Sequence, residues 1–189
     1  MNIGVLSLQG AFLKHMHLLK KIGVNPVNVR YKDDLLNLHG LIIPGGESTV
    51  LSKLIIKQSL YEPLEKFIRK YPVYGTCAGL ILLSKIIEKN KIVKSFEKLD
   101  ITIKRNAWGR QINSFISNLK IKEFDSTFKG IFIRAPKINK VSSSVDILSS
   151  INNSPVMVRQ DNLLGTTFHP ELSNDVRIHK YFIGMIESC

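Results

Sequence analysis

The sequence predicts a single-domain α/β fold, with a mostly parallel central sheet flanked by helices and a small antiparallel extension. Short apolar runs alternate with amphipathic helical patterns over residues 1–100, whereas short strand patterns dominate after residue 100. The length of 189 residues suits one domain, and a hydrophobic content of 44% is enough for a sizeable core. No repeat or Pro/Gly/Ser linker divides the chain.

The first half of the chain alternates between strands and helices. An apolar run over 3–8 predicts a first strand, and apolar residues at helical spacing over 12–22 predict a helix that ends at Gly23. A second apolar run, 41–43, stops at Pro44, and Ser48 or Thr49 is expected to cap the helix that follows. The other elements expected here are strands over 26–30 and 73–76, and helices over 61–70 and 78–88.

The second half is expected to consist mainly of strands that form the extension and then return to the main sheet. A helix over about 174–187 closes the domain. The expected strands cover 101–104, 116–121, 130–134, 145–148, 156–160 and 163–168.

The formal net charge is +12, from 27 basic and 15 acidic residues. Twenty of the cations are lysines spread along the chain without a dense basic stripe, so we expect a solvated surface and no specific nucleic-acid partner. No apolar run reaches the length of a membrane helix, and the N-terminal run reads as a buried strand and not as a secretion signal. Because no such run is present, we expect no membrane partner. Two cysteines, Cys77 and Cys189, are too few for a disulfide framework, which favours a cytoplasmic location.

One strand-to-helix junction, Gly75-Thr76-Cys77-Ala78-Gly79, is built from small residues around a cysteine. Small neighbours let a sharp turn hold one side chain in a strained conformation without a clash. Cys77 would then lie at a helix N-terminus, which favours the nucleophilic thiolate, and the N–H of Ala78 would face an oxyanion. Taken alone, a buried structural cysteine explains the segment equally well.

A second strand is expected to end at Phe168-His169-Pro170-Glu171. A thiol nucleophile needs a base, and the base needs an orienting acceptor. Of the five histidines, only His169 is expected at the carboxyl end of a strand with a carboxylate, Glu171, beside it. Because the carboxyl ends of parallel strands share one edge of a sheet, Cys77, His169 and Glu171 are expected to converge as a catalytic triad.

A third strand is expected to end at Pro44-Gly45-Gly46-Glu47-Ser48-Thr49. Adjacent glycines can adopt positive φ and let their N–H groups approach an anion, so Gly45 or Gly46 is a candidate second oxyanion donor opposite Ala78. Glu47 and Ser48 offer polar contacts to an amino-acid substrate. An ordinary turn is the simpler explanation, and a phosphate-binding loop would need a Gly-Lys-Ser/Thr ending that is missing here.

With these segments, the chain resembles the class I (triad) glutamine amidotransferases, whose domain is flavodoxin-like. It resembles more closely the family of glutaminase subunits of pyridoxal 5'-phosphate synthase. Besides the three strand ends, the resemblance rests on 4–10 (GVLSLQG), 105–106 (RN) with 109–111 (GRQ), and 132–136 (FIRAP). It extends over nearly the whole chain and implies one glutamine amidotransferase domain over residues 1–189.

The resemblance implies a glutaminase that hydrolyses L-glutamine to L-glutamate and ammonia through a γ-glutamyl thioester. Cys77 would be the nucleophile, His169 the base and Glu171 its orienting residue. The ammonia would pass to a (β/α)₈-barrel synthase subunit in a hetero-oligomer, for pyridoxal 5'-phosphate (vitamin B6) biosynthesis, and neither a cofactor nor a metal is implied. The residues implied to bind glutamine are Gly46, Glu47, Ser48, Arg105, Ile133 and Arg134, and those implied near the partner and the ammonia path are Gln9 and Gly10.

Two alternatives stay open on the sequence. The glutaminase subunit of another ammonia-channelling synthase, such as imidazole glycerol phosphate synthase, would use the same Cys77 chemistry with a different acceptor. A non-catalytic interaction protein could keep the fold, although the presence of all three triad groups disfavours it. Which arginine would take the glutamine α-carboxylate is also open.

Overall fold

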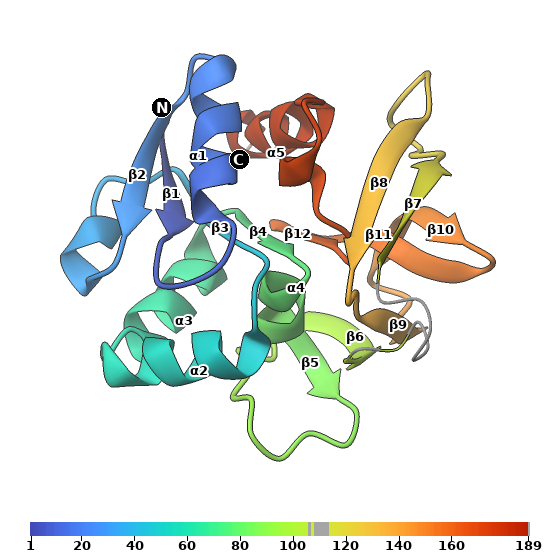
Figure 1. The fold of residues 1–189 in the computed structure, drawn as a ribbon. Helices are drawn as coiled ribbons and strands as arrows, with labels where there is room; N and C mark the ends of the chain where they lie inside the picture. Colours follow the sequence, from blue (N-terminus) through green and yellow to red (C-terminus); the bar gives the residue numbers. More distant parts are fainter. Residues whose placement is uncertain (106, 108–113, 189) are drawn as a thin grey trace.

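The computed structural model describes residues 1–105, 107 and 114–188 and contains one large sheet, two small sheets and five α-helices in these residues (Figure 1). The strands of the large sheet are β1 (Asn2–Leu6), β2 (Asn25–Val29), β3 (Gly40–Ile43), β4 (Val73–Thr76), β10 (Asp146–Ile151), β11 (Ser154–Gln160) and β12 (Leu163–Thr166). Their order is β10-β11-β12-β4-β3-β1-β2. The strands from β12 to β2 are parallel, and β11 and β10 extend the sheet in antiparallel pairing, so the predicted α/β class is confirmed.

Helices cover both faces of this sheet. The α-helices are α1 (Phe12–Lys21), α2 (Ser48–Lys57), α3 (Tyr61–Lys70), α4 (Ala78–Leu83) and α5 (Arg177–Glu187). Successive side chains of a strand point to opposite faces. Leu41 and Ile43 of β3 therefore join a core with α2, α3 and α4, whereas Ile42 packs on the other face with α1 and α5. No helix in the described ranges is long and apolar enough to cross a membrane.

Two small sheets lie beside the main one, and the predicted antiparallel pairing is present between β6 and β9 and between β7 and β8, whereas β5 and β6 are parallel. A three-stranded sheet joins β5 (Ser84–Ile87), β6 (Leu99–Lys104) and β9 (Lys137–Val141), and β7 (Ser114–Leu119) pairs with β8 (Phe128–Ile133) in a hairpin. The strand β9 was not expected from the sequence. In Figure 1 the β7–β8 hairpin stands beside β11 and β10, away from α2 and α3.

Two expected helix boundaries were wrong. The helix expected over 78–88 ends at Leu83, and residues 84–87 form β5, which pairs in parallel with β6. The Ser84 hydroxyl donates to the Ile81 carbonyl, and the β-branched pair Ile86 and Ile87 favours a strand. The last helix begins at Arg177 instead of about 174.

Candidate active site

Cys77 occupies the sharp turn between β4 and α4. Its φ of 46° and ψ of −98° form a strained conformation for a residue with a side chain. Its backbone N–H donates to the Thr166 carbonyl of β12 at 2.8 Å, which ties the turn to the neighbouring strand. A Cβ at Gly75 would collide with the backbone of Gly79, and a Cβ at Gly79 would collide with β3. The predicted need for small residues around the cysteine is therefore confirmed.

His169 follows β12, immediately before the short 3-10 helix η2 (Pro170–Leu172). Its backbone N–H donates to the Ile131 carbonyl of β8 at 2.8 Å, and its Nδ1 lies 2.7 Å from Oε1 of Glu171. The ring and the Cys77 side chain line the same cavity. All three side chains are buried, with Glu171 only 2% exposed. The structure thus brings together three residues from two strand ends, as the sequence predicted.

The electrostatics of this cluster favour a charged imidazole. Burial lowers the pKa of His169, but the interactions of the ring with Cys77 and Glu171 outweigh burial and raise this pKa to about 10. Burial raises the pKa of the Glu171 carboxyl, whereas the electrostatic effect of His15 and the hydrogen bond from His169 bring it below its usual value. An imidazolium beside a thiolate is the form in which a cysteine acts as a nucleophile.

A cavity of about 310 Å³ opens beside the thiol. Its wall contains every residue that the resemblance implied for glutamine binding, together with Gln9. The lining residues are Gln9, Gly46, Glu47, Ser48, Cys77, Ile81, Arg105, Ile133, Arg134 and His169. Ile81, one turn into α4 from Cys77, was missed from the sequence. Gly10, Gly45, Ala78 and Glu171 lie outside this wall.

The two glycines after β3 do not adopt the positive φ that was expected of them. Among Gly10, Gly45 and Gly46, only Gly10 has a backbone in the left-handed region, with φ of +93°. Glycine is instead needed because the backbone passes so close to its neighbours. A Cβ at Gly45 would collide with the His169 ring, and one at Gly46 would collide with the Gln9 side chain.

Glu47 caps α2, so the expectation of a Ser48 or Thr49 cap was wrong. Its carboxylate accepts the backbone N–H groups of Thr49 at 3.1 Å and Val50 at 2.7 Å, whereas Ser48 is already inside the helix. Arg105 Nη2 lies 3.3 Å from the same carboxylate and donates to the Thr49 hydroxyl at 3.0 Å. The cap and Arg105 therefore form one polar group at the wall of the cavity.

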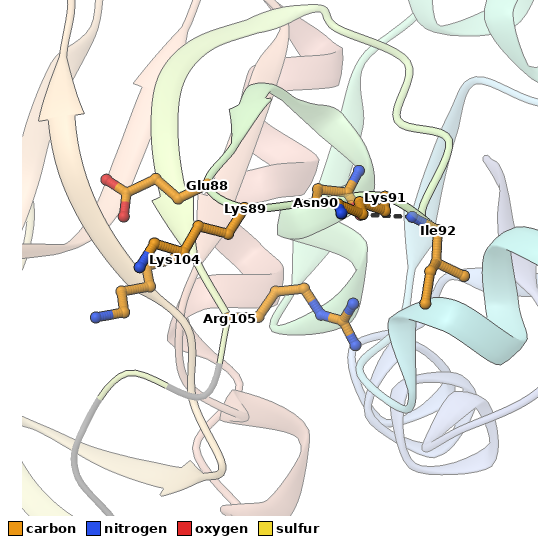
Figure 2. Close-up of a pocket in the computed structure, with 7 residues that line it drawn as sticks. All are labelled: Glu88, Lys89, Asn90, Lys91, Ile92, Lys104 and Arg105. Carbon is orange, nitrogen blue, oxygen red and sulfur yellow. Dashed lines mark hydrogen bonds between the residues drawn. The ribbon is translucent and has the colours of Figure 1, made fainter.

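A larger cavity of about 420 Å³ lies on the other side of Arg105 (Figure 2). It is lined by Glu88, Lys89, Asn90, Lys91, Ile92, Lys104 and Arg105. Figure 2 shows the Arg105 guanidinium directed away from Lys104 and Glu88. Because Cys77 and His169 line the smaller cavity, the smaller cavity is the candidate active site.

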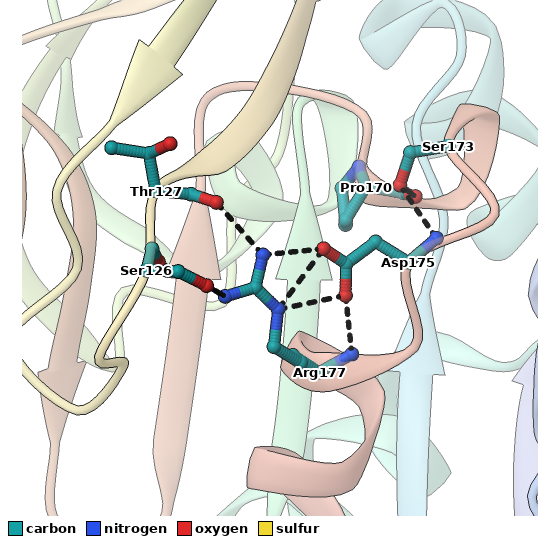
Figure 3. Close-up of polar contacts among 6 residues, drawn as sticks. All are labelled: Ser126, Thr127, Pro170, Ser173, Asp175 and Arg177. Atoms are coloured by element: carbon teal, nitrogen blue, oxygen red, sulfur yellow. Dashed lines mark hydrogen bonds and ion pairs between the residues drawn. The ribbon is translucent and has the colours of Figure 1, made fainter.

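A cluster around Arg177 holds the segment that follows Glu171 (Figure 3). The guanidinium pairs with Asp175, with Nη2 2.6 Å from Oδ2, and donates to the carbonyls of Ser126 at 3.0 Å and Thr127 at 2.8 Å. It therefore fixes the start of α5 to the segment just before β8. Since β8 also binds the His169 backbone through Ile131, the cluster supports the position of the imidazole.

Two histidines that the sequence did not single out lie behind Glu171. His15 of α1 and His179 of α5 are fully buried. His15 falls on the apolar face of its helix with Leu18 and Leu19. This placement of a histidine among core residues is the one sequence feature that could have pointed to it.

Some residues named in the sequence analysis lie outside the described residues. They are Asn106, Gly109, Arg110, Gln111 and Cys189.

A Cys-His-Glu cluster at the carboxyl edge of a parallel α/β sheet is the arrangement of the triad glutamine amidotransferases. Comparison with known proteins agrees with this class. The model of the SNO glutamine amidotransferase family matches residues 5–188, and the chain belongs to this family.

The chain is also similar over nearly its whole length to several curated proteins. The chain is 50% identical over 186 residues to the "Pyridoxal 5'-phosphate synthase subunit PdxT" of Pseudothermotoga lettingae, which covers 98% of this chain and 95% of that one. It is 48% identical over 188 residues to the protein of the same name from Fervidobacterium nodosum, at 99% and 98% coverage. A solved structure titled "Crystal structure of glutamine amidotransferase" matches with a TM-score of 0.93 and 38% identity, over 98% of both chains.

Proposed function

We propose that this chain is the glutaminase subunit of a pyridoxal 5'-phosphate synthase. It hydrolyses L-glutamine to L-glutamate and ammonia and delivers the ammonia to a (β/α)₈-barrel synthase subunit. The full-length similarity to the synthase subunits of two bacteria supports the pathway. The observation that carries the chemistry is that Cys77 and His169 line one cavity while Glu171 contacts the imidazole. We take residues 1–189 as one glutamine amidotransferase domain.

The reaction uses two proton transfers through His169. The Cys77 thiolate attacks the side-chain amide carbon of glutamine, and the imidazolium gives its proton to the leaving nitrogen, which departs as ammonia. The γ-glutamyl thioester remains on the sulfur. Neutral His169 then takes a proton from water, the hydroxide attacks the thioester, and glutamate leaves as the thiolate and imidazolium are restored. Glu171 stays ionised and fixes the ring through its 2.7 Å contact with Nδ1.

The tetrahedral oxyanion needs donors on one side of the amide. We assign these donors to the N–H of Ala78, the first residue of α4, and to the N–H of Gly45 or Gly46. The Gly45 carbonyl accepts the Ala11 N–H at 3.1 Å, a bond that fixes the peptide plane between the two glycines. Gln9 and Gly10 lie against the same glycines, which suits a role of this loop near the partner and the ammonia path.

Recognition of glutamine falls to the cavity wall. Two arginines in this wall can pair with the α-carboxylate of an amino acid, and Glu47 can pair with its α-amino group. Ser48, Ile133 and Gly46 complete the contact with the substrate chain. We place this activity in the cytoplasm, where reducing conditions keep a thiolate nucleophile free.

Glutamate release from glutamine tests the proposal. Purified chain is assayed alone and with the barrel synthase of a pyridoxal 5'-phosphate synthase, beside Cys77→Ala. We expect the synthase to stimulate release by the wild type and no release by the variant. Stimulation only by the barrel of imidazole glycerol phosphate synthase would support that pathway instead, and no release with either barrel would favour a non-catalytic interaction protein.

A further inference from the structure

The buried side of Glu171 faces a pair of histidines from the two helices on one face of the sheet. His15 Nε2 lies 3.4 Å from Oε2 of Glu171 and 3.3 Å from the Thr76 hydroxyl. His15 Nδ1 lies 2.9 Å from Nε2 of His179, 164 positions away in the chain. Residues from α1, β4, α5 and η2 therefore meet directly behind the candidate triad.

The proton positions in this chain follow from the partners. Glu171 is an acceptor through both oxygens when it is ionised, and His169 already donates to Oε1. Oε2 has no hydrogen-bond partner among the described residues, and His15 Nε2 lies 3.4 Å from it and 3.3 Å from the Thr76 hydroxyl. A proton of His15 on Nε2 would face these two oxygens and would leave Nδ1 as an acceptor. His179 then donates from Nε2, and its own Nδ1 carries only a lone pair. This assignment explains why Nδ1 of His179 can be buried without a partner in the described part of the chain.

The opposite assignment is much less favourable. If His15 carried its proton on Nδ1, it would donate to His179, and the Nδ1–H of His179 would be a stranded donor. Its Nε2 lone pair could accept from the Thr76 hydroxyl, but it would also face Oε2 of Glu171, a buried oxygen with no hydrogen-bond partner among the described residues. An unpaired buried charge costs far more than an unpaired lone pair of a neutral ring. Burial lowers the pKa of both rings, that of His179 to about 3, and therefore favours the neutral forms that this chain of bonds requires, whereas the charge of Glu171 opposes the effect at His15.

We propose that His15 is a positioning residue for the reaction: its Nε2–H, set by His179, holds one oxygen of Glu171 so that the other keeps His169 oriented toward Cys77. The terminal torsion of a glutamate side chain is broad, so a single hydrogen bond fixes the carboxylate poorly. Donors on both oxygens leave it one orientation. This inference rests on the proposed function, because His169 must be the base for its orientation to matter.

The kinetic test compares three variants in the presence of the barrel synthase. His15→Leu removes the donor, whereas His15→Gln places an amide N–H near the position of Nε2. We expect His15→Leu to lower kcat on the order of 10- to 100-fold with little change in KM, and His15→Gln to recover most of the loss. His39→Leu, an exposed histidine before β3 at the opposite edge of the sheet, is the control and is expected to be unaffected. Thermal unfolding of each variant shows that it is folded.

A second measurement does not depend on activity. The ¹⁵N shifts of the His15 ring in the free wild-type chain are expected to show a neutral ring with its proton on Nε2. A proton on Nδ1, or His15→Gln as inactive as His15→Leu while equally folded, would overturn the proposal. If the wild type released no glutamate, the proposed function would fail, and the ring shifts would still decide the assignment of His15.

Discussion

Gly45 lies so close to the imidazole of His169 that a Cβ at position 45 would overlap the ring. The glycine therefore determines where the ring can lie, independently of any conformational role. We expect Gly45→Ala to displace His169 and to lower kcat on the order of 10- to 100-fold or more, because small displacements of a catalytic group are costly. Steady-state glutamate release with the synthase measures this effect.

Gly184→Ala is the matched control for this substitution. Nothing lies within 4 Å of a Cβ there, and the residue is inside α5. We expect unchanged activity and a gain of about 0.5–1 kcal/mol in the free energy of unfolding, since alanine favours a helix. An active Gly45→Ala enzyme would contradict the packing argument.

The pKa of His169 links stability to pH. Its value of about 10 in the folded chain lies above the ordinary 6.5. The stabilisation from this charge is therefore fully present below about pH 6.5 and is lost as the pH rises through about 10. We expect the difference in free energy of unfolding between wild type and His169→Asn to shrink between about pH 6 and pH 10. Urea denaturation across this range measures the difference, and a constant value would contradict the raised pKa.

Arg134 and Arg105 differ in how much of their charge is already paired. Arg105 contacts Glu47 and Thr49, whereas no hydrogen bond or ion pair of the Arg134 side chain is found within the described ranges. We expect Arg134→Lys to raise the KM for glutamine on the order of tenfold, and Arg105→Lys to raise it less, because a lysine cannot form the bidentate contact. A larger increase for Arg105→Lys would assign the α-carboxylate to that residue instead.

Arg177→Lys tests the cluster of Figure 3. Lysine keeps the charge but cannot reach Asp175, Ser126 and Thr127 together. We expect the free energy of unfolding to fall by about 1–3 kcal/mol, as measured by urea denaturation. Arg69→Lys, in an exposed pair with Glu65 on α3, should change it by less than about 0.5 kcal/mol. Equal losses for the two variants would contradict a supporting role for the cluster.

Local sequence was sufficient for the elements that position the site. Expected strand 73–76 and helix 61–70 match β4 and α3 residue for residue, because apolar periodicity and turn residues mark both ends. The turn at Cys77 was also predictable, since only small residues fit a strand-to-helix junction of this kind. The approach of His169 followed from a general rule about strand ends.

Features that depend on distant partners could not be predicted in this way. The strand β5 exists because β6 pairs with it, although residues 84–87 continue a helical apolar pattern. The role of Gly45 depends on a ring 124 positions away, counted from 45 to 169. His15 and His179 come together only through the packing of α1 and α5 on one face of the sheet. For His15 the sequence offered only its place on the apolar face of a helix, which does not reveal the partner of its side chain.

The most direct test of the central claim is covalent labelling by a glutamine analogue with an electrophilic carbon in place of the side-chain amide. The chain is incubated with this analogue and the synthase, and the adduct is located by peptide mass spectrometry. We expect one adduct per chain, on Cys77, and protection by excess glutamine. Labelling elsewhere, or full glutamate release by a chain whose Cys77 stays unlabelled, would contradict the account.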